Sequence, residues 1–126
     1  MIKIKEAVIV EGRYDKIKLS SIVDAPIIET NGFRVFADKE KQNLIRQIAE
    51  ARGILILTDS DGAGFVIRNF LNGVVDKSKI KHCYIPQIAG KEKRKAQKSK
   101  EGFLGVEGIN DDVIIDAIRK SGATII

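Results

Sequence analysis

Two runs of consecutive large apolar residues are the clearest feature of the hydrophobic pattern. The first lies within Glu6–Glu11, where four apolar residues stand between two glutamates, and the second is Ile54–Leu57. Uninterrupted apolar runs of this length, rich in β-branched residues, are typical of strands buried on both faces of a parallel sheet. Both runs therefore predict central strands.

Two further stretches, residues 27–30 and 81–85, contain β-branched or aromatic residues typical of strands, and they predict two further strands, the second of them closed by Pro86. Helical spacing alternates with the strands, most clearly in residues 39–52, with Asp38 as the expected N-cap and Gly53 as the residue that ends the helix. Other helices are expected at residues 13–23, 64–72 and 111–121, and residues 123–126 fit an edge strand. This alternation predicts an α/β fold, with a mostly parallel four-stranded sheet flanked by helices on both faces.

Length and composition fit one globular domain. The chain has 126 residues, of which 44% are hydrophobic and 31% charged. No apolar run is long enough to span a bilayer, and the N-terminus lacks the apolar centre of a signal peptide. We therefore expect no membrane partner and a cytoplasmic location.

The single cysteine, Cys83, excludes an intrachain disulfide. It lies in a predicted strand, which favours a buried and unreactive thiol. The single histidine, His82, is its neighbour, and without a partner cysteine motif the pair does not predict a zinc site.

The net charge of +5 is concentrated in one segment. Residues 91–100 carry six basic side chains and one acidic one, which leaves the rest of the chain near neutral. We expect a basic loop at about residues 87–104, inserted before the last helix. Such a loop favours a polyanionic partner, and the alternative is an ordinary solvated loop.

Three carboxylates follow the two central strands. Asp59 and Asp61 come directly after the second strand, at the edge of the sheet where open α/β folds bind ligands. Two neighbouring carboxylates repel one another unless a cation lies between them, and oxygen ligands suit Mg²⁺. The alternative is a loop in which one aspartate caps the next helix. Glu11 ends the first strand, and it meets Asp59 across one crevice if the two strands are neighbours.

These residues resemble the motif of a known family. Glu11 with Gly12 after one buried strand, and Asp59, Asp61 and Gly64 after another, are similar to the Toprim domain of topoisomerases, bacterial primases and several nucleases. The resemblance implies a Rossmann-like Toprim fold spanning residues 1–126. It also implies that Glu11, Asp59 and Asp61 are the catalytic residues and hold one or two Mg²⁺ ions, for which Mn²⁺ can substitute.

Within that family the chain most resembles the ribonuclease that trims precursor 5S ribosomal RNA. The resemblance rests on further stretches at residues 10–13, 28–32, 58–61 and 104–107. It implies a magnesium-dependent endoribonuclease whose partner is RNA, specifically precursor 5S ribosomal RNA, together with a ribosomal protein. Family members carry a further RNA-binding segment after the Toprim domain, which we expect to be missing here.

Other side chains are expected around this site. Arg13 and Arg68 are candidates for contact with the scissile phosphate, or for ion pairs with the acidic cluster. Asn31, Gly32 and Gly64 are expected to shape the rim, while Glu107 is either a peripheral ligand or the partner of a lysine. The basic segment supplies the candidates for flanking phosphates, namely Lys91, Lys93, Arg94, Lys95, Lys98 and Lys100.

Two alternatives stay open. Ala63 before Gly64 is closer to the primase form of the motif, which favours a protein that acts on DNA. The other is a Toprim domain that binds nucleic acid without cleaving it, although the complete set of three carboxylates argues against that reading.

Overall fold

The computed structural model describes residues 1–58, 62–85 and 108–126. A four-stranded sheet with strand order β4-β2-β5-β6 forms its centre, and every neighbouring pair of strands is parallel. The strands are β2 (Ala7–Val10), β4 (Ile27–Glu29), β5 (Ile54–Thr58) and β6 (Ile80–Tyr84). The predicted α/β class and four-stranded parallel sheet are confirmed.

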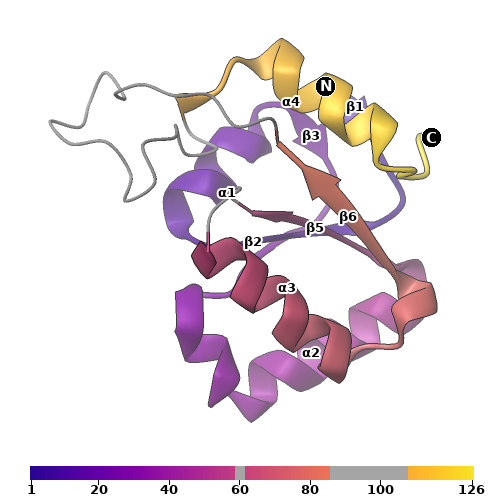
Figure 1. Ribbon diagram of the computed structural model, residues 1–126. Coiled ribbons are helices and arrows are strands. Elements are labelled where there is room, and N and C mark those ends of the chain that lie inside the picture. Colours follow the sequence, from indigo (N-terminus) through magenta and orange to yellow (C-terminus); the bar gives the residue numbers. More distant parts are fainter. Residues whose placement is uncertain (59–61, 86–107) are drawn as a thin grey trace, which may run out of the picture.

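Helices cover both faces of this sheet (Figure 1). One face packs against α1 (Arg13–Ser20) and α4 (Asp111–Lys120) through a cluster that includes Leu19 and Ile114. The other packs against α2 (Lys39–Arg52) and α3 (Gly62–Val74) through a cluster that includes Ile45 and Ile67. Residues of β2 and β5 alternate between the two clusters, which explains why both strands are apolar throughout.

Helix α2 begins after Asp38 and ends before Gly53, as the sequence predicts. The carboxylate of Asp38 accepts a hydrogen bond of 2.9 Å from the main-chain N–H of Lys41. At the other end Gly53 has φ +77°, and a Cβ there would lie 3.5 Å from the carbonyl oxygen of Lys79. This backbone conformation favours glycine.

Several elements differ from the prediction. The first helix ends at Ser20 rather than near residue 23, because Val23–Asp24 form β3, which pairs with β1 (Ile2–Lys3) in a separate two-stranded sheet. A 3₁₀ helix, η1 (Gly32–Phe36), follows β4, and a second, η2 (Lys77–Lys79), precedes β6. The last residues form an antiparallel bridge between Ile125 and Ile4. No helix in the described ranges is long and apolar enough to cross a membrane.

Candidate active site at the carboxyl edge of the sheet

The candidate site lies where the four parallel strands end. Ile9 of β2 pairs with Ile56 of β5, so continuing this register by two residues places Glu11 level with Thr58. Thr58 in turn pairs with Tyr84 at the end of β6. The strands that precede Glu11 and Asp59 are therefore neighbours, which is the condition for the two carboxylates to meet.

The turn after β4 holds the backbone at Glu11. The carbonyl oxygen of Glu11 accepts a hydrogen bond of 3.1 Å from the N–H of Gly32 and one of 3.3 Å from the buried hydroxyl of Thr30. Asn31 and Gly32 both have positive φ, 59° and 62°, which turns the chain from the strand into η1. Asn31 and Gly32 thus lie at the rim, and Thr30 is an anchor that the sequence analysis missed.

Two helices begin at the same edge. Helix α1 starts two residues after Glu11, with the exposed Arg13 as its first residue, and α3 starts at Gly62, shortly after β5. Main-chain N–H groups at helix N-termini favour anions such as phosphate. Gly64 is buried in the first turn of α3. The local electrostatics of this edge therefore suit a phosphodiester.

Arg68 lies inside the protein, where 4% of its surface is exposed. Its guanidinium donates to the carbonyl oxygen of Ile56 at 3.0 Å and to that of Cys83 at 2.6 Å. It also lies 4.5 Å from the centre of the Tyr84 ring. Burial lowers the pKa of Arg68, and its Nε has no hydrogen-bond partner among the described residues. The guanidinium of Arg68 therefore joins α3 to β5 and β6, and its predicted contact with the scissile phosphate or with the acidic cluster stays a prediction.

The contacts and burial of the neighbouring His82 and Cys83 indicate structural roles for both residues. A guanidinium only donates, so Nδ1 of His82 accepts the 2.9 Å hydrogen bond from Arg68. Burial, and then the charge of Arg68, lower the pKa of His82. Burial raises the pKa of Cys83 to about 12, which keeps the thiol protonated and unreactive, as predicted.

Most of the predicted site residues lie outside the described ranges. These are Asp59, Asp61, Glu107 and the basic residues Lys91, Lys93, Arg94, Lys95, Lys98 and Lys100. Within the described ranges, no three histidine, cysteine or acidic residues cluster as metal ligands. The acidic triad therefore stays a prediction. The structure describes Glu11 and also Thr58, the last residue of β5, which directly precedes Asp59 in the sequence.

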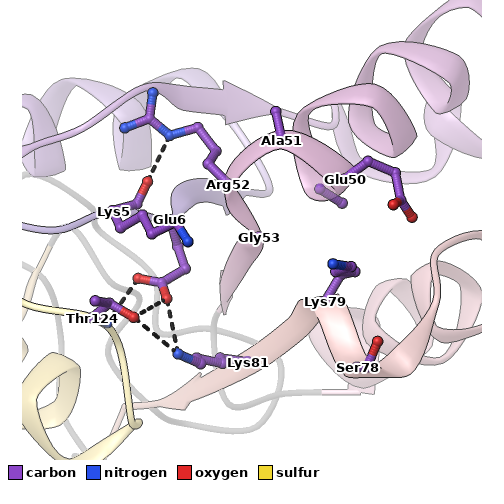
Figure 2. Close-up of a pocket in the computed structure, with 11 residues that line it drawn as sticks. Lys5, Glu6, Glu50, Ala51, Arg52, Gly53, Ser78, Lys79, Lys81 and Thr124 are labelled. Atoms are coloured by element: carbon purple, nitrogen blue, oxygen red, sulfur yellow. Dashed lines mark hydrogen bonds and ion pairs between the residues drawn. The ribbon is translucent and has the colours of Figure 1, made fainter.

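A second polar cluster closes the opposite, amino edge of the sheet (Figure 2). Glu6 is buried, and its carboxylate pairs with Lys81 at 2.9 Å. It also accepts hydrogen bonds from the N–H of Thr124 at 2.8 Å and from its hydroxyl at 2.7 Å. The residues border a cavity of about 200 Å³ that Arg52 and Lys79 also line. Glu6 thus joins β2, β6 and the C-terminal residues, which is a structural role.

The sequence and the fold of this chain are similar to those of known proteins. A family model described as Toprim domain matches residues 6–88. Ribonuclease M5 of Fusobacterium nucleatum subsp. nucleatum is 34% identical over 119 residues, which are 94% of this chain and 59% of that protein. Ribonuclease M5 of Bacillus subtilis is 40% identical over 93 residues, 74% of this chain and 48% of that protein. The chain thus spans about half of the length of these curated relatives.

A solved structure shares the fold. A small TOPRIM domain protein from Bacillus stearothermophilus matches with a TM-score of 0.68, covering 100% of this chain and 96% of that one. The two sequences are 20% identical, so this likeness concerns the fold alone.

Proposed function

Because the chain belongs to the Toprim domain family, we propose that it is the catalytic domain of a metal-dependent endoribonuclease that cleaves structured RNA. The ribonuclease M5 names of its relatives support RNA as the substrate class. We propose precursor 5S ribosomal RNA as that substrate, a ribosomal protein as a partner in binding it, and the cytoplasm as the location. In this proposal residues 1–126 form one Toprim domain.

The observation that carries the proposal is the position of Glu11. The register of β2 on β5 brings it level with Thr58, from which Asp59 and Asp61 follow directly along the chain. Carboxylate oxygens are the ligands that Mg²⁺ prefers, so this donor set fits one or two Mg²⁺ ions, with Mn²⁺ as a substitute. A divalent ion bound there would neutralise charge on the phosphate and favour ionisation of a water nucleophile.

The protein's own groups would position the substrate. Glu11 is half-buried at the edge, where it can also take up or release a proton as a general acid or base. Arg13 and the N-termini of α1 and α3 would bind the phosphate on either side of the cut. The six basic residues of segment 91–100 would bind flanking phosphates, which gives affinity without sequence selection.

Cleavage assays with matched variants test this function. The purified chain is incubated with Mg²⁺ and either a precursor 5S ribosomal RNA transcript, single-stranded DNA or duplex DNA. We expect cleavage of the RNA, loss of at least a hundredfold in rate for Glu11→Gln and Asp59→Ala, and an unchanged rate for Glu50→Gln, an exposed glutamate at the amino edge. Cleavage of DNA alone would favour the primase-like reading. Full activity in Asp59→Ala would refute the proposed site.

A further inference from the structure

The peptide group between Glu11 and Gly12 is held at both of its ends. Its carbonyl oxygen, on Glu11, accepts hydrogen bonds from the N–H of Gly32 at 3.1 Å and from the hydroxyl of Thr30 at 3.3 Å. Its N–H, on Gly12, donates a hydrogen bond of 3.1 Å to the carboxylate of Asp15. A trans peptide is planar, and its C=O and N–H point in opposite directions. These hydrogen bonds therefore fix the orientation of the whole group from two sides.

The groups that hold this peptide are themselves held by the fold. Thr30 is 1% exposed, and its N–H donates a hydrogen bond of 2.9 Å to the carbonyl oxygen of Val10, the last residue of β2. Asp15 is the third residue of α1, whose N-cap is Gly12. A turn after one strand and the first turn of a helix thus set the main-chain path through Glu11. The direction of the Cα–Cβ bond of Glu11 follows from that path rather than from a bound ion.

A carboxylate whose backbone is fixed in advance affects which ion a site prefers. Mg²⁺ requires near-octahedral geometry with oxygen ligands at about 2.0–2.1 Å, whereas Ca²⁺ accepts flexible geometry at about 2.3–2.6 Å. A ligand that is anchored for the short distances cannot move outward at little cost, so the larger ion binds under strain. Releasing the anchor lets the ligand adapt, which weakens binding of the small ion and relieves the strain of the large one.

We propose that Thr30 and Asp15 are positioning residues, which hold Glu11 ready for an ion of the size of Mg²⁺ and so make the site discriminate against Ca²⁺. The inference rests on the proposed function and deepens it, because it names the interactions that give the proposed metal site its selectivity. Thr30 acts through the carbonyl group of Glu11 and Asp15 through the N–H of Gly12. Neither residue is itself a ligand of the ion in this proposal.

The test measures the affinities of the purified chain for Mn²⁺ and Ca²⁺ by isothermal titration calorimetry, in the absence of RNA. Mn²⁺ is the probe because it is the proposed substitute for Mg²⁺ and prefers the same oxygen ligands. Thr30→Val removes the hydroxyl and keeps the shape of the side chain. We expect it to bind Mn²⁺ about 10-fold more weakly than the wild type, while its affinity for Ca²⁺ changes by less than about 3-fold. Thr30→Ser keeps the hydroxyl and should bind both ions like the wild type.

Two matched comparisons separate positioning from stability and from charge. Thr124→Val removes a hydroxyl that donates a hydrogen bond of 2.7 Å to Glu6 at the opposite edge of the sheet, so it lowers stability away from the site. Both of its affinities should equal those of the wild type. Asp15→Asn keeps an oxygen that can accept the same main-chain hydrogen bond, and its affinity for Mn²⁺ should stay within about 3-fold of the wild type. Asp15→Ala should lose as much affinity as Thr30→Val.

The outcomes separate this inference from the proposed function. An unchanged affinity of Thr30→Val for Mn²⁺, in a chain that cleaves RNA, would overturn the inference alone. Equal losses for Mn²⁺ and Ca²⁺ would also overturn it, because they would show a weaker site and not a less selective one. Equal losses in Asp15→Asn and Asp15→Ala would show that the charge of Asp15 matters and would overturn its positioning role. The expected loss for Mn²⁺, in a chain that cleaves no RNA, would support the inference and refute the nuclease.

Discussion

Glu6 and Glu11 lie at opposite ends of β2, in opposite surroundings. Glu6 is 3% exposed and ion-paired with Lys81, whereas Glu11 is half-buried at the edge where the strands end. In a parallel sheet the two edges differ, since helix N-termini and ligands gather at the carboxyl edge. The same residue type therefore stabilises the fold at one end of the strand and is proposed to perform chemistry at the other.

Replacing Glu6 by Gln tests its structural role. The substitution keeps the shape of the side chain but leaves the ammonium group of Lys81 without its counter-charge and weakens the hydrogen bonds from Thr124. Lys81 is partly exposed, so we expect the free energy of unfolding to fall by about 1–3 kcal/mol in urea titrations. Glu50→Gln, on the rim of the same cavity, should change it by less than about 0.5 kcal/mol. Equal stability of both variants would contradict the assignment.

Low pH should remove the stabilisation that the Glu6 carboxylate gives to the folded state. Burial raises the pKa of Glu6, but the ion pair with Lys81 and the hydrogen bonds from Thr124 outweigh it and lower the pKa from 4.5 to about 2. A carboxyl group with a lowered pKa stabilises the folded state above its unfolded pKa, and this contribution disappears as the pH falls from 4.5 towards 2. It amounts to about 3 kcal/mol at most. The stability difference between wild type and Glu6→Gln should therefore shrink between pH 6 and pH 3; a constant difference would show that Glu6 does not titrate in this range.

The buried Arg68 should resist conservative replacement. A lysine cannot bond the carbonyl groups of Ile56 and Cys83 together, because it lacks the planar fork of the guanidinium. We expect Arg68→Lys to lower the free energy of unfolding by about 2 kcal/mol. Arg13→Lys, at an exposed position, should stay within about 0.5 kcal/mol. Similar values for the two variants would mean that the buried hydrogen bonds contribute little.

Salt dependence tests the basic segment. Six phosphate contacts would give a slope of log affinity against log salt of roughly −4 to −5 for RNA. Changing Lys93, Arg94 and Lys95 to Gln should reduce the magnitude of this slope by about 2 to 3. The control changes Lys5, Lys77 and Lys79, at the amino edge, and should leave the slope as it is. A change of similar size in both variants would indicate attraction by net charge rather than by this segment.

The sequence predicted the central strands and α2 well because their signals are local. An unbroken apolar run indicates a strand buried on both faces, and Asp38 and Gly53 mark the ends of α2. The strands β1 and β3 were missed since two residues are too few to show a period, and their pairing joins distant parts of the chain. The 3₁₀ helix η1, into which Asn31 and Gly32 lead, was also missed, because a helix of five residues is too short to show a helical period.

The sequence indicated which carboxylates could form the candidate site, but not how the side chains around them are arranged. The position of Glu11 directly after an apolar run predicts that it lies at the carboxyl edge of the sheet. It lies near the end of β5 because β2 and β5 are neighbouring strands. The role of Arg68 could not, because an arginine in a helix gives no sign that its guanidinium reaches two strand carbonyl groups. The exposure of Tyr84 at the site likewise depends on the strand order, which places β6 at the edge of the sheet.

A crystal of this chain soaked in Mn²⁺ tests the central claim most directly, because the anomalous signal locates the ion independently of any activity. The account predicts an ion bound jointly by the carboxylates of Glu11, Asp59 and Asp61, at oxygen distances of about 2.0–2.4 Å. Mn²⁺ bound elsewhere, with the Glu11 carboxylate directed away from the two aspartates, would contradict it.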